Sequence, residues 1–460
     1  MLLQDGAWRG SPHQGYVRVE PDRYGHARPL GCKGAKEFLT LNSVVVRRVE
    51  EGTNAAPICK AGSFMVTAVS AGSRRALRTP RPRRPMLWQV CKAAYLFERP
   101  GSGARVLILN GLQVIDRRSN SYIASATFHQ GGRRCRMDQK IKIELYRTMV
   151  LIRSFEEAIL RDYHADKKPA WDIGAGLIPG EMHLSAGQEP VAAGICANLS
   201  PGDGITATHR PHHLAIAHGV SLKALAAEIF GRETGLGKGR GGHMHLFDPA
   251  SHFSCSGIIA EGYPPALGQA FAFKWKKTPN VIVAVTGEGA ANQGAFHESL
   301  NLAALWKLPV VFVVEDNDWA ISVPRHASTA IASNAERAAA YGIPGERIED
   351  NNVEAIWRSA KTAIDRARSG EGPSLLEIHT VRLWGHFEGD AQAYRDDLDA
   401  ATAHDPLPAY EAQLISEGFL DSAQAEAIKE ECVSEVEAAL SFAKASPLPD
   451  GADALRYVFA

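Results

Sequence analysis

Three short apolar runs constrain the fold of this chain more than any other feature. They read VIVAVT at 281–286, VVFVVE at 310–315 and LLEIHTV at 375–381. Apolar runs of this length, bounded by glycine or polar residues, indicate strands that are buried on both faces. A segment with helical patterning at 290–306 separates the first two runs. We therefore predict an α/β domain with a parallel sheet covered by helices on both sides.

Helical patterning begins abruptly at Met137 and sets the limits of this predicted domain, which we place at 137–460. Further helices are expected at 141–162, 189–199 and 221–230, and an acidic helical section at 406–446. Between them, six glycines fall within residues 231–242. We expect this loop to be flexible and to let the backbone approach a ligand closely.

Residues 1–136 differ from the rest of the chain in charge and in pattern. They hold 23 Lys and Arg against 8 Asp and Glu, whereas residues 137–460 hold 28 against 43. They include Arg- and Pro-rich pieces such as 73–85, and no coherent series of elements is evident. A basic arm for nucleic acid, a cleaved organelle presequence and a start site assigned too far upstream would each produce this composition. We favour the last, with the segment disordered or not a selected domain.

Composition also argues against several classes of protein. No run of ~18 uncharged apolar residues is present, so no membrane span is predicted. The seven cysteines make no CxxC pair, which disfavours a zinc site or a redox dithiol. We expect reduced thiols in a reducing compartment, the cytoplasm.

Polar residues follow the first two predicted strands at the points where they end. Gly287-Glu288-Gly289 follows one strand and Asn317 follows the next. Ligands of open parallel sheets lie at the carboxyl ends of the strands, so Glu288 and Asn317 should converge. Their oxygens suit Mg²⁺, and a glycine-flanked helix start suits a diphosphate. A nicotinamide or flavin fingerprint is the weaker alternative, because Asn292 stands where its third small residue belongs.

Gly-Glu-Gly, followed 26 residues later by Asp-Asn, resembles the thiamine-diphosphate motif, usually written Gly-Asp-Gly and Asn-Asn. The chain from about 145 to about 449 resembles the alpha subunit of the thiamine-diphosphate-dependent decarboxylating component of 2-oxo acid (pyruvate or branched-chain) or acetoin dehydrogenase complexes. The similarity implies a three-layer α/β/α fold. It is carried by residues 182–189, 208–210, 237–245, 292–294, 301–309 and 385–386.

The resemblance implies roles for individual residues. The metal ligands would be Glu288, Asn317 and the backbone carbonyl of Trp319. The cofactor would be bound by His209, Arg210, Gly257, Ile259, Gly287, Glu288, Gly289, Ala290 and Asn317. Three histidines, which can transfer protons near neutral pH, would handle substrate: His183, His245 and His386. The remaining histidines are interpreted as structural. Phe387 stands where animal members carry a phosphorylated serine, so regulation there is not expected.

The resemblance also implies the reaction and the partners. With thiamine diphosphate and Mg²⁺, the enzyme would oxidatively decarboxylate a 2-oxo acid, most readily pyruvate, and pass the acyl group to lipoamide on the lipoyl domain of an acyltransferase component. Cleavage of acetoin is the alternative. In the family, a separate beta subunit supplies the carboxylate that activates the cofactor. We therefore expect an α2β2 heterotetramer that shares its active site, with no nucleic-acid or membrane partner.

Overall fold

The computed structural model describes residues 137–165, 167 and 172–456, and within residues 1–136 the backbone of six short strands. The six strands form three antiparallel pairs. They are β1 (Val45–Arg48), β2 (Phe64–Thr67), β3 (Ala94–Glu98), β4 (Arg105–Leu109), β5 (Gln113–Asp116) and β6 (Ser121–Ser125). Contacts divide the chain into two units, Met1–Arg134 and Cys135–Ala460. Apart from these strands, the prediction that residues 1–136 are disordered falls on residues outside those described.

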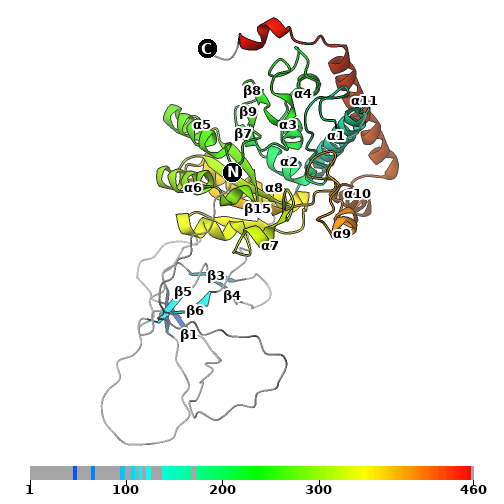
Figure 1. Ribbon diagram of the computed structural model, residues 1–460. Coiled ribbons are helices and arrows are strands. Elements are labelled where there is room, and N and C mark those ends of the chain that lie inside the picture. Colours follow the sequence, from blue (N-terminus) through cyan, green and yellow to red (C-terminus); the bar gives the residue numbers. More distant parts are fainter. Residues whose placement is uncertain are drawn as a thin grey trace, which may run out of the picture. The chain divides into compact units, whose positions relative to one another are not determined.

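The second unit is built on a seven-stranded sheet in the order β14-β15-β11-β10-β7-β9-β8 (Figure 1). The first six strands in this order are parallel, which confirms the predicted α/β fold. β8 differs, because it pairs antiparallel with β9 through a connection too short for a crossover. The strands are β7 (Gly204–Ala207), β8 (Phe247–Asp248), β9 (Phe253–Cys255), β10 (Ile282–Gly287), β11 (Val310–Asp316), β14 (Gly345–Ile348) and β15 (Ser374–His379).

Alternate residues of the central strands enter two separate cores. Val283 and Val285 of β10 lie in a core with α1, α2, α3, α4, α8 and α11, whereas Ile282 and Ala284 lie in a core with α5, α6 and the 3-10 helix η3. This alternation produces the three predicted layers. The helices are α1 (Gln139–His164), α2 (Glu189–Cys196), α3 (His212–Ala217), α4 (Leu222–Ile229), α5 (Tyr263–Lys276), α6 (Gly294–Trp306), η3 (Asn334–Tyr341), α8 (Val353–Arg368) and α11 (Ser422–Ala445).

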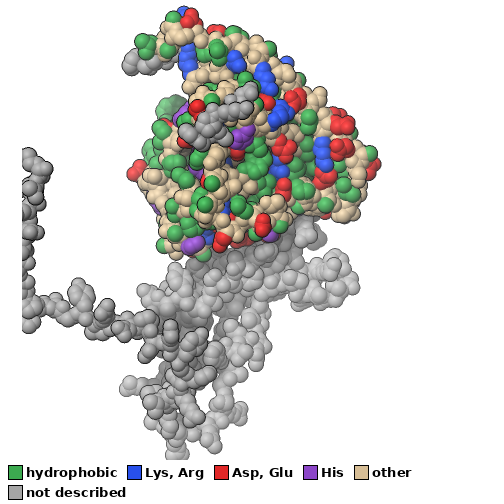
Figure 2. Space-filling model, turned by 45° about the vertical axis from the view of Figure 1, so that its right-hand side comes forward, with side chains coloured by type: hydrophobic (Ala, Val, Ile, Leu, Met, Phe, Trp, Pro, Cys, Tyr) green, Lys and Arg blue, Asp and Glu red, His purple; other side chains and the backbone are tan. Residues whose placement is uncertain are grey.

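The acidic section expected to be helical at 406–446 contains α10 (Pro406–Ser416) and α11, and these helices pack on α1. Tyr410 and Leu414 of α10 share a third core with Leu145 and Met149 of α1. Charged side chains of both signs are interspersed on the face drawn in Figure 2. Among the described residues, no helix is both long and apolar enough to cross a bilayer. The remaining short elements are η1 (Gly242–Met244), η2 (Ala290–Asn292), β12 (Trp319–Ala320), β13 (Val323–Pro324), α7 (Arg325–Ser328), α9 (Leu398–Ala403) and η4 (Gly451–Leu455).

A buried ion pair joins α1 to the starts of α2 and α10. Arg153 Nε donates to Glu189 Oε1 at 2.6 Å, and its two terminal nitrogens donate to the Asp405 carboxylate at 2.9 and 3.0 Å. Glu189 has no exposed surface and also accepts the Gly187 N–H at 2.9 Å. The negative charge of Glu189 therefore depends on Arg153 rather than on water.

We expect Arg153→Ala to lower the free energy of unfolding by roughly 3–5 kcal/mol, because it leaves the Glu189 charge buried without a partner. Arg161→Ala, on the same helix, is the matched control. The Arg161 side chain is 53% exposed and pairs with Glu437 at 2.6 Å, so its loss should cost less than about 1 kcal/mol. Urea unfolding of both variants, followed by circular dichroism, measures the difference. Equal losses would contradict this account of the pair.

Candidate functional site

The ends of β10 and β11 bring the two predicted metal ligands to one edge of the sheet. Gly287 pairs with Glu315 in the parallel register of these strands. Glu288 directly follows Gly287, and Asn317 stands two residues after Glu315. Because adjacent parallel strands end at the same edge, both side chains reach the wall of the same cavity.

Glu288 and Asn317 present oxygens that no protein group satisfies. Glu288 is buried, and its Oε1 has no hydrogen-bond partner; Asn317 Oδ1 is likewise unpaired. Burial, with a further contribution from the negative charge of Asp316, raises the pKa of Glu288 to about 8. Burial also raises the pKa of Asp316, to about 6. A buried carboxylate and amide oxygen without partners fit a hard cation such as Mg²⁺.

A cavity of about 730 Å³ lies at this edge of the sheet. Every residue that the sequence singled out as a ligand or a catalytic group lines it: His183, His209, Arg210, His245, Gly257, Ile259, Gly287, Glu288, Gly289, Ala290, Asn317, Trp319 and His386. The structure thus brings together the whole predicted set, which comes from loops spread over about 200 residues of sequence. The role of each residue remains a prediction.

The helix expected at 290–306 does not begin directly after the Gly-Glu-Gly turn. Ala290–Asn292 forms a single 3-10 turn, Gln293 is extended with ψ 147°, and α6 begins at Gly294. Asn292 belongs to the 3-10 turn, and its amide donates to Ser328 O at 3.2 Å and accepts from Arg337 at 2.7 Å. The N–H groups next to Glu288 therefore belong to a short turn. Gly289 packs against Ala320 with no room for a side chain.

Glycines of the glycine-rich loop bind a carboxylate of the protein itself, a contact that the sequence did not predict. Glu228, fully buried at the end of α4, accepts the N–H groups of Gly237, Gly239 and Gly241 at 2.7, 2.8 and 2.7 Å. A Cβ on Gly239 or Gly241 would overlap backbone atoms. The close approach allowed by glycine is thus made to Glu228.

Two guanidinium groups give one side of the cavity a positive charge. Arg210 is buried, donates to the Leu184 carbonyl and donates to His386 O at 2.9 Å. Burial and the neighbouring Arg382 lower the pKa of Arg210 to about 10, so it stays charged near neutral pH. Arg382 donates to Tyr394 Oη at 2.8 Å. This side of the cavity suits an anion such as a diphosphate or a carboxylate.

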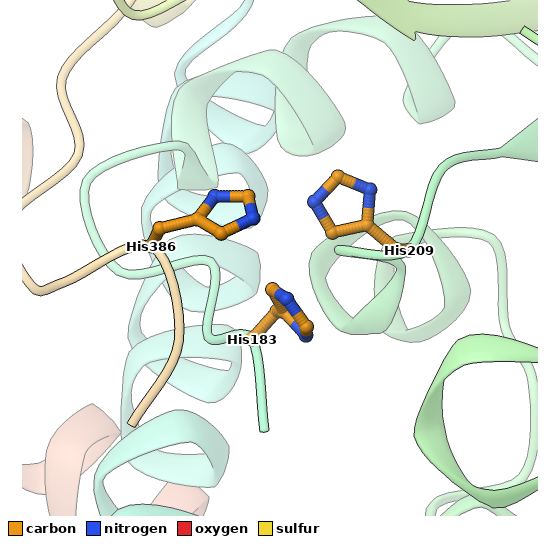
Figure 3. Close-up of side chains that lie close together, drawn as sticks. All are labelled: His183, His209 and His386. Carbon is orange, nitrogen blue, oxygen red and sulfur yellow. The ribbon is translucent and has the colours of Figure 1, made fainter. Parts of the chain in front are cut away.

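Three histidine rings face one another at the same end of the cavity (Figure 3). The ring centroid of His183 lies 4.8 Å from that of His209 and 4.9 Å from that of His386. Burial, then the charge of Arg210, lowers the pKa of His209 to about 3 and that of His386 to about 4, and lowers that of His183 as well. All three imidazoles are therefore neutral at pH 7. His245 lies apart from them, against Gly257.

Sequence reasoning did not identify Arg382 as part of the site, and it interpreted His243 as structural. Arg382 follows β15 closely, so the rule that ligands gather at strand ends would have found it. His243, interpreted as structural, contacts His183, with its Nε2 3.3 Å from His183 Nδ1. No pattern in the sequence marks this contact, because it depends on the fold of the glycine-rich loop.

Comparison with known proteins agrees with this geometry. The family described as Dehydrogenase E1 component matches residues 147–451. The alpha subunit of acetoin:2,6-dichlorophenolindophenol oxidoreductase from Bacillus subtilis is 41% identical over 319 residues, covering 68% of this chain and 92% of that protein. The pyruvate dehydrogenase E1 component subunit alpha from Rhizobium meliloti is 36% identical over 324 residues, covering 70% and 90%. The chain therefore belongs to the dehydrogenase E1 component family.

Proposed function

We propose that this chain is the alpha subunit of an enzyme that oxidatively decarboxylates a 2-oxo acid, most readily pyruvate, and passes the acyl group to lipoamide. Membership of the E1 family implies thiamine diphosphate, which supplies the carbon nucleophile when bound. The observation that carries the proposal is the pair of unpaired oxygens, Glu288 Oε1 and Asn317 Oδ1, in a cavity that also holds Arg210.

Each part of the cavity then has a task. Glu288, Asn317 and the Trp319 carbonyl hold Mg²⁺, and the turn from Gly289 lies beside them to receive the diphosphate. Arg210 provides a positive charge for the same anion. The neutral rings of His183 and His386 accept a proton, or donate one from an N–H, where the acyl group is transferred, and His245, which lines the same cavity, serves the same end.

A beta subunit is the partner that an E1 alpha chain implies. Apolar residues that line the cavity are exposed in this chain: Ile258 by 63%, Ile259 by 50%, Ile321 by 57% and Val323 by 44%. An exposed apolar rim is a typical protein interface. We propose that the beta subunit covers this rim in a cytoplasmic α2β2 assembly, adds the activating carboxylate and leaves access for a lipoyl domain.

Glu288→Ala should reduce turnover by more than about 100-fold, because it removes a direct metal ligand, and loss of even an outer-shell partner costs 10–100-fold. The assay is dye-coupled oxidation by the complex with its beta subunit, tested with pyruvate, a branched-chain 2-oxo acid and acetoin. Glu298→Ala, an exposed carboxylate on α6, is the control and should retain activity. Turnover of acetoin alone would identify the alternative reaction. Full activity of Glu288→Ala would refute the metal assignment.

Binding of Mg²⁺ should release a proton below pH 8. The pKa of Glu288 is raised to about 8 in the metal-free protein, so at lower pH the carboxyl is mainly protonated, whereas the metal binds the ionised form. Apparent affinity should therefore rise about 16-fold in total between pH 6.5 and 8 and level off above pH 9 or so, roughly one unit past the pKa.

Titration calorimetry at pH 7, in two buffers that differ in ionisation enthalpy, measures this proton release. Glu288→Gln, which cannot ionise, is the control and should show weaker binding without the pH dependence. Identical heats in both buffers for the unaltered protein would contradict the prediction.

A further inference from the structure

We propose that His183, His209 and His386 form a second metal site in this chain, one that takes a borderline divalent cation such as Zn²⁺ through imidazole nitrogens. The proposal goes beyond the Mg²⁺ site, since it involves different residues, different donor atoms and a different class of ion. The three side chains come from three loops, before α2, before α3 and after β15.

The geometry already approaches that of a metal centre. One ring nitrogen from each histidine lies within 4.8 Å of the other two. A central point then lies at most about 2.8 Å from each nitrogen, while zinc–imidazole bonds measure about 2.0–2.1 Å. Each nitrogen would have to move by less than about 1 Å to close this gap. Figure 3 shows the rings arranged around one space rather than stacked in a line.

The donor set selects the kind of ion. Neutral imidazole is a preferred ligand of Zn²⁺, Cu²⁺ and Ni²⁺, whereas Mg²⁺ prefers carboxylate, carbonyl and water. His183 Nδ1 contacts His243 Nε2 at 3.3 Å, which leaves His183 Nε2 for the ion and holds the ring in place. Such contacts from a second group commonly orient histidine ligands. Three nitrogens leave one tetrahedral position for water or a substrate oxygen.

The positive charges of nearby arginines oppose the binding of a metal ion and limit its affinity. Arg210 and Arg382 repel a divalent ion, while Asp390, whose carboxylate accepts the backbone N–H of His386 at 2.8 Å, offsets part of this repulsion. Arg210 already donates to the carbonyls of Leu184 and His386, which disperses its charge. We therefore expect binding in the micromolar range, weaker than that of three-histidine sites without neighbouring cations.

Occupancy would inhibit the enzyme. An ion bound to all three rings ties together the loops that form one end of the cavity, and it occupies the lone pairs that the proposed function uses for proton transfer. The Mg²⁺ ligands Glu288 and Asn317 are left untouched.

Co²⁺ is the probe for the test, added to the full chain in the presence of excess Mg²⁺. Tetrahedral nitrogen ligation gives an intense visible absorption band that Zn²⁺ should abolish by competition. His209→Gln and His386→Gln should each weaken Co²⁺ binding at least tenfold. His404→Gln, an exposed histidine in the C-terminal section, should leave it unchanged. Circular dichroism and thermal unfolding confirm that each variant is folded.

Three results would overturn the proposal. One is weak absorption typical of octahedral cobalt only. Another is sulfur-to-metal charge transfer, which would place the ion on cysteines. The third is a spectrum that the two histidine variants do not alter. Micromolar Zn²⁺ inhibition of the assembled complex is a separate measurement that rests on the proposed function, so the binding test stands even where turnover is not found.

Discussion

The parallel pairing of β10 with β11 is the constraint on which the site depends. Its register places Gly287 beside Glu315, so that Glu288 and Asn317 leave the sheet at one edge. A slip of one residue would turn each side chain to the opposite face of its strand. The two cores prevent such a slip, because Val283 belongs to one core and Ala284 to the other. Packing of ordinary apolar residues thus determines where the unpaired oxygens lie.

The positively charged side of the cavity is positioned by buried pairs between the start of α3 and carboxylates of α1 and β11. Arg210 lies just before α3, and the first two residues of α3 each pair with a buried carboxylate. His212 Nδ1 lies 3.0 Å from Glu156 Oε2 on α1, and His213 Nε2 lies 2.7 Å from Glu315 Oε1 on β11. Because α1 also packs against the C-terminal helices, this distant section of the chain contributes to the position of Arg210.

The parts of the site that were predictable from sequence depend on local pattern. The apolar runs correctly predicted β10 and β11. The residues that follow these strands lie at one edge of the sheet, as expected for the ends of adjacent parallel strands. The break at Gln293 was not predictable, because it depends on contacts of Asn292 with residues far along the chain. The same is true of the glycine-rich loop, since nothing near its glycines in the sequence identifies Glu228 as their acceptor. Short-range periodicity thus predicts elements, whereas the partners of buried polar groups require the fold.

One cavity can hold two sets of metal ligands because the two sets differ in the hardness of their donor atoms as well as in position. Glu288 and Asn317 offer oxygens, and a hard cation takes these in preference to imidazole. At the histidine cluster, burial and the neighbouring Arg210 lower the pKa of His209 and His386 and keep the rings uncharged, which leaves their lone pairs free to bind a softer ion. The free lone pairs that let His183 and His386 take a proton are therefore the same lone pairs that, with that of His209, expose the cluster to a competing metal.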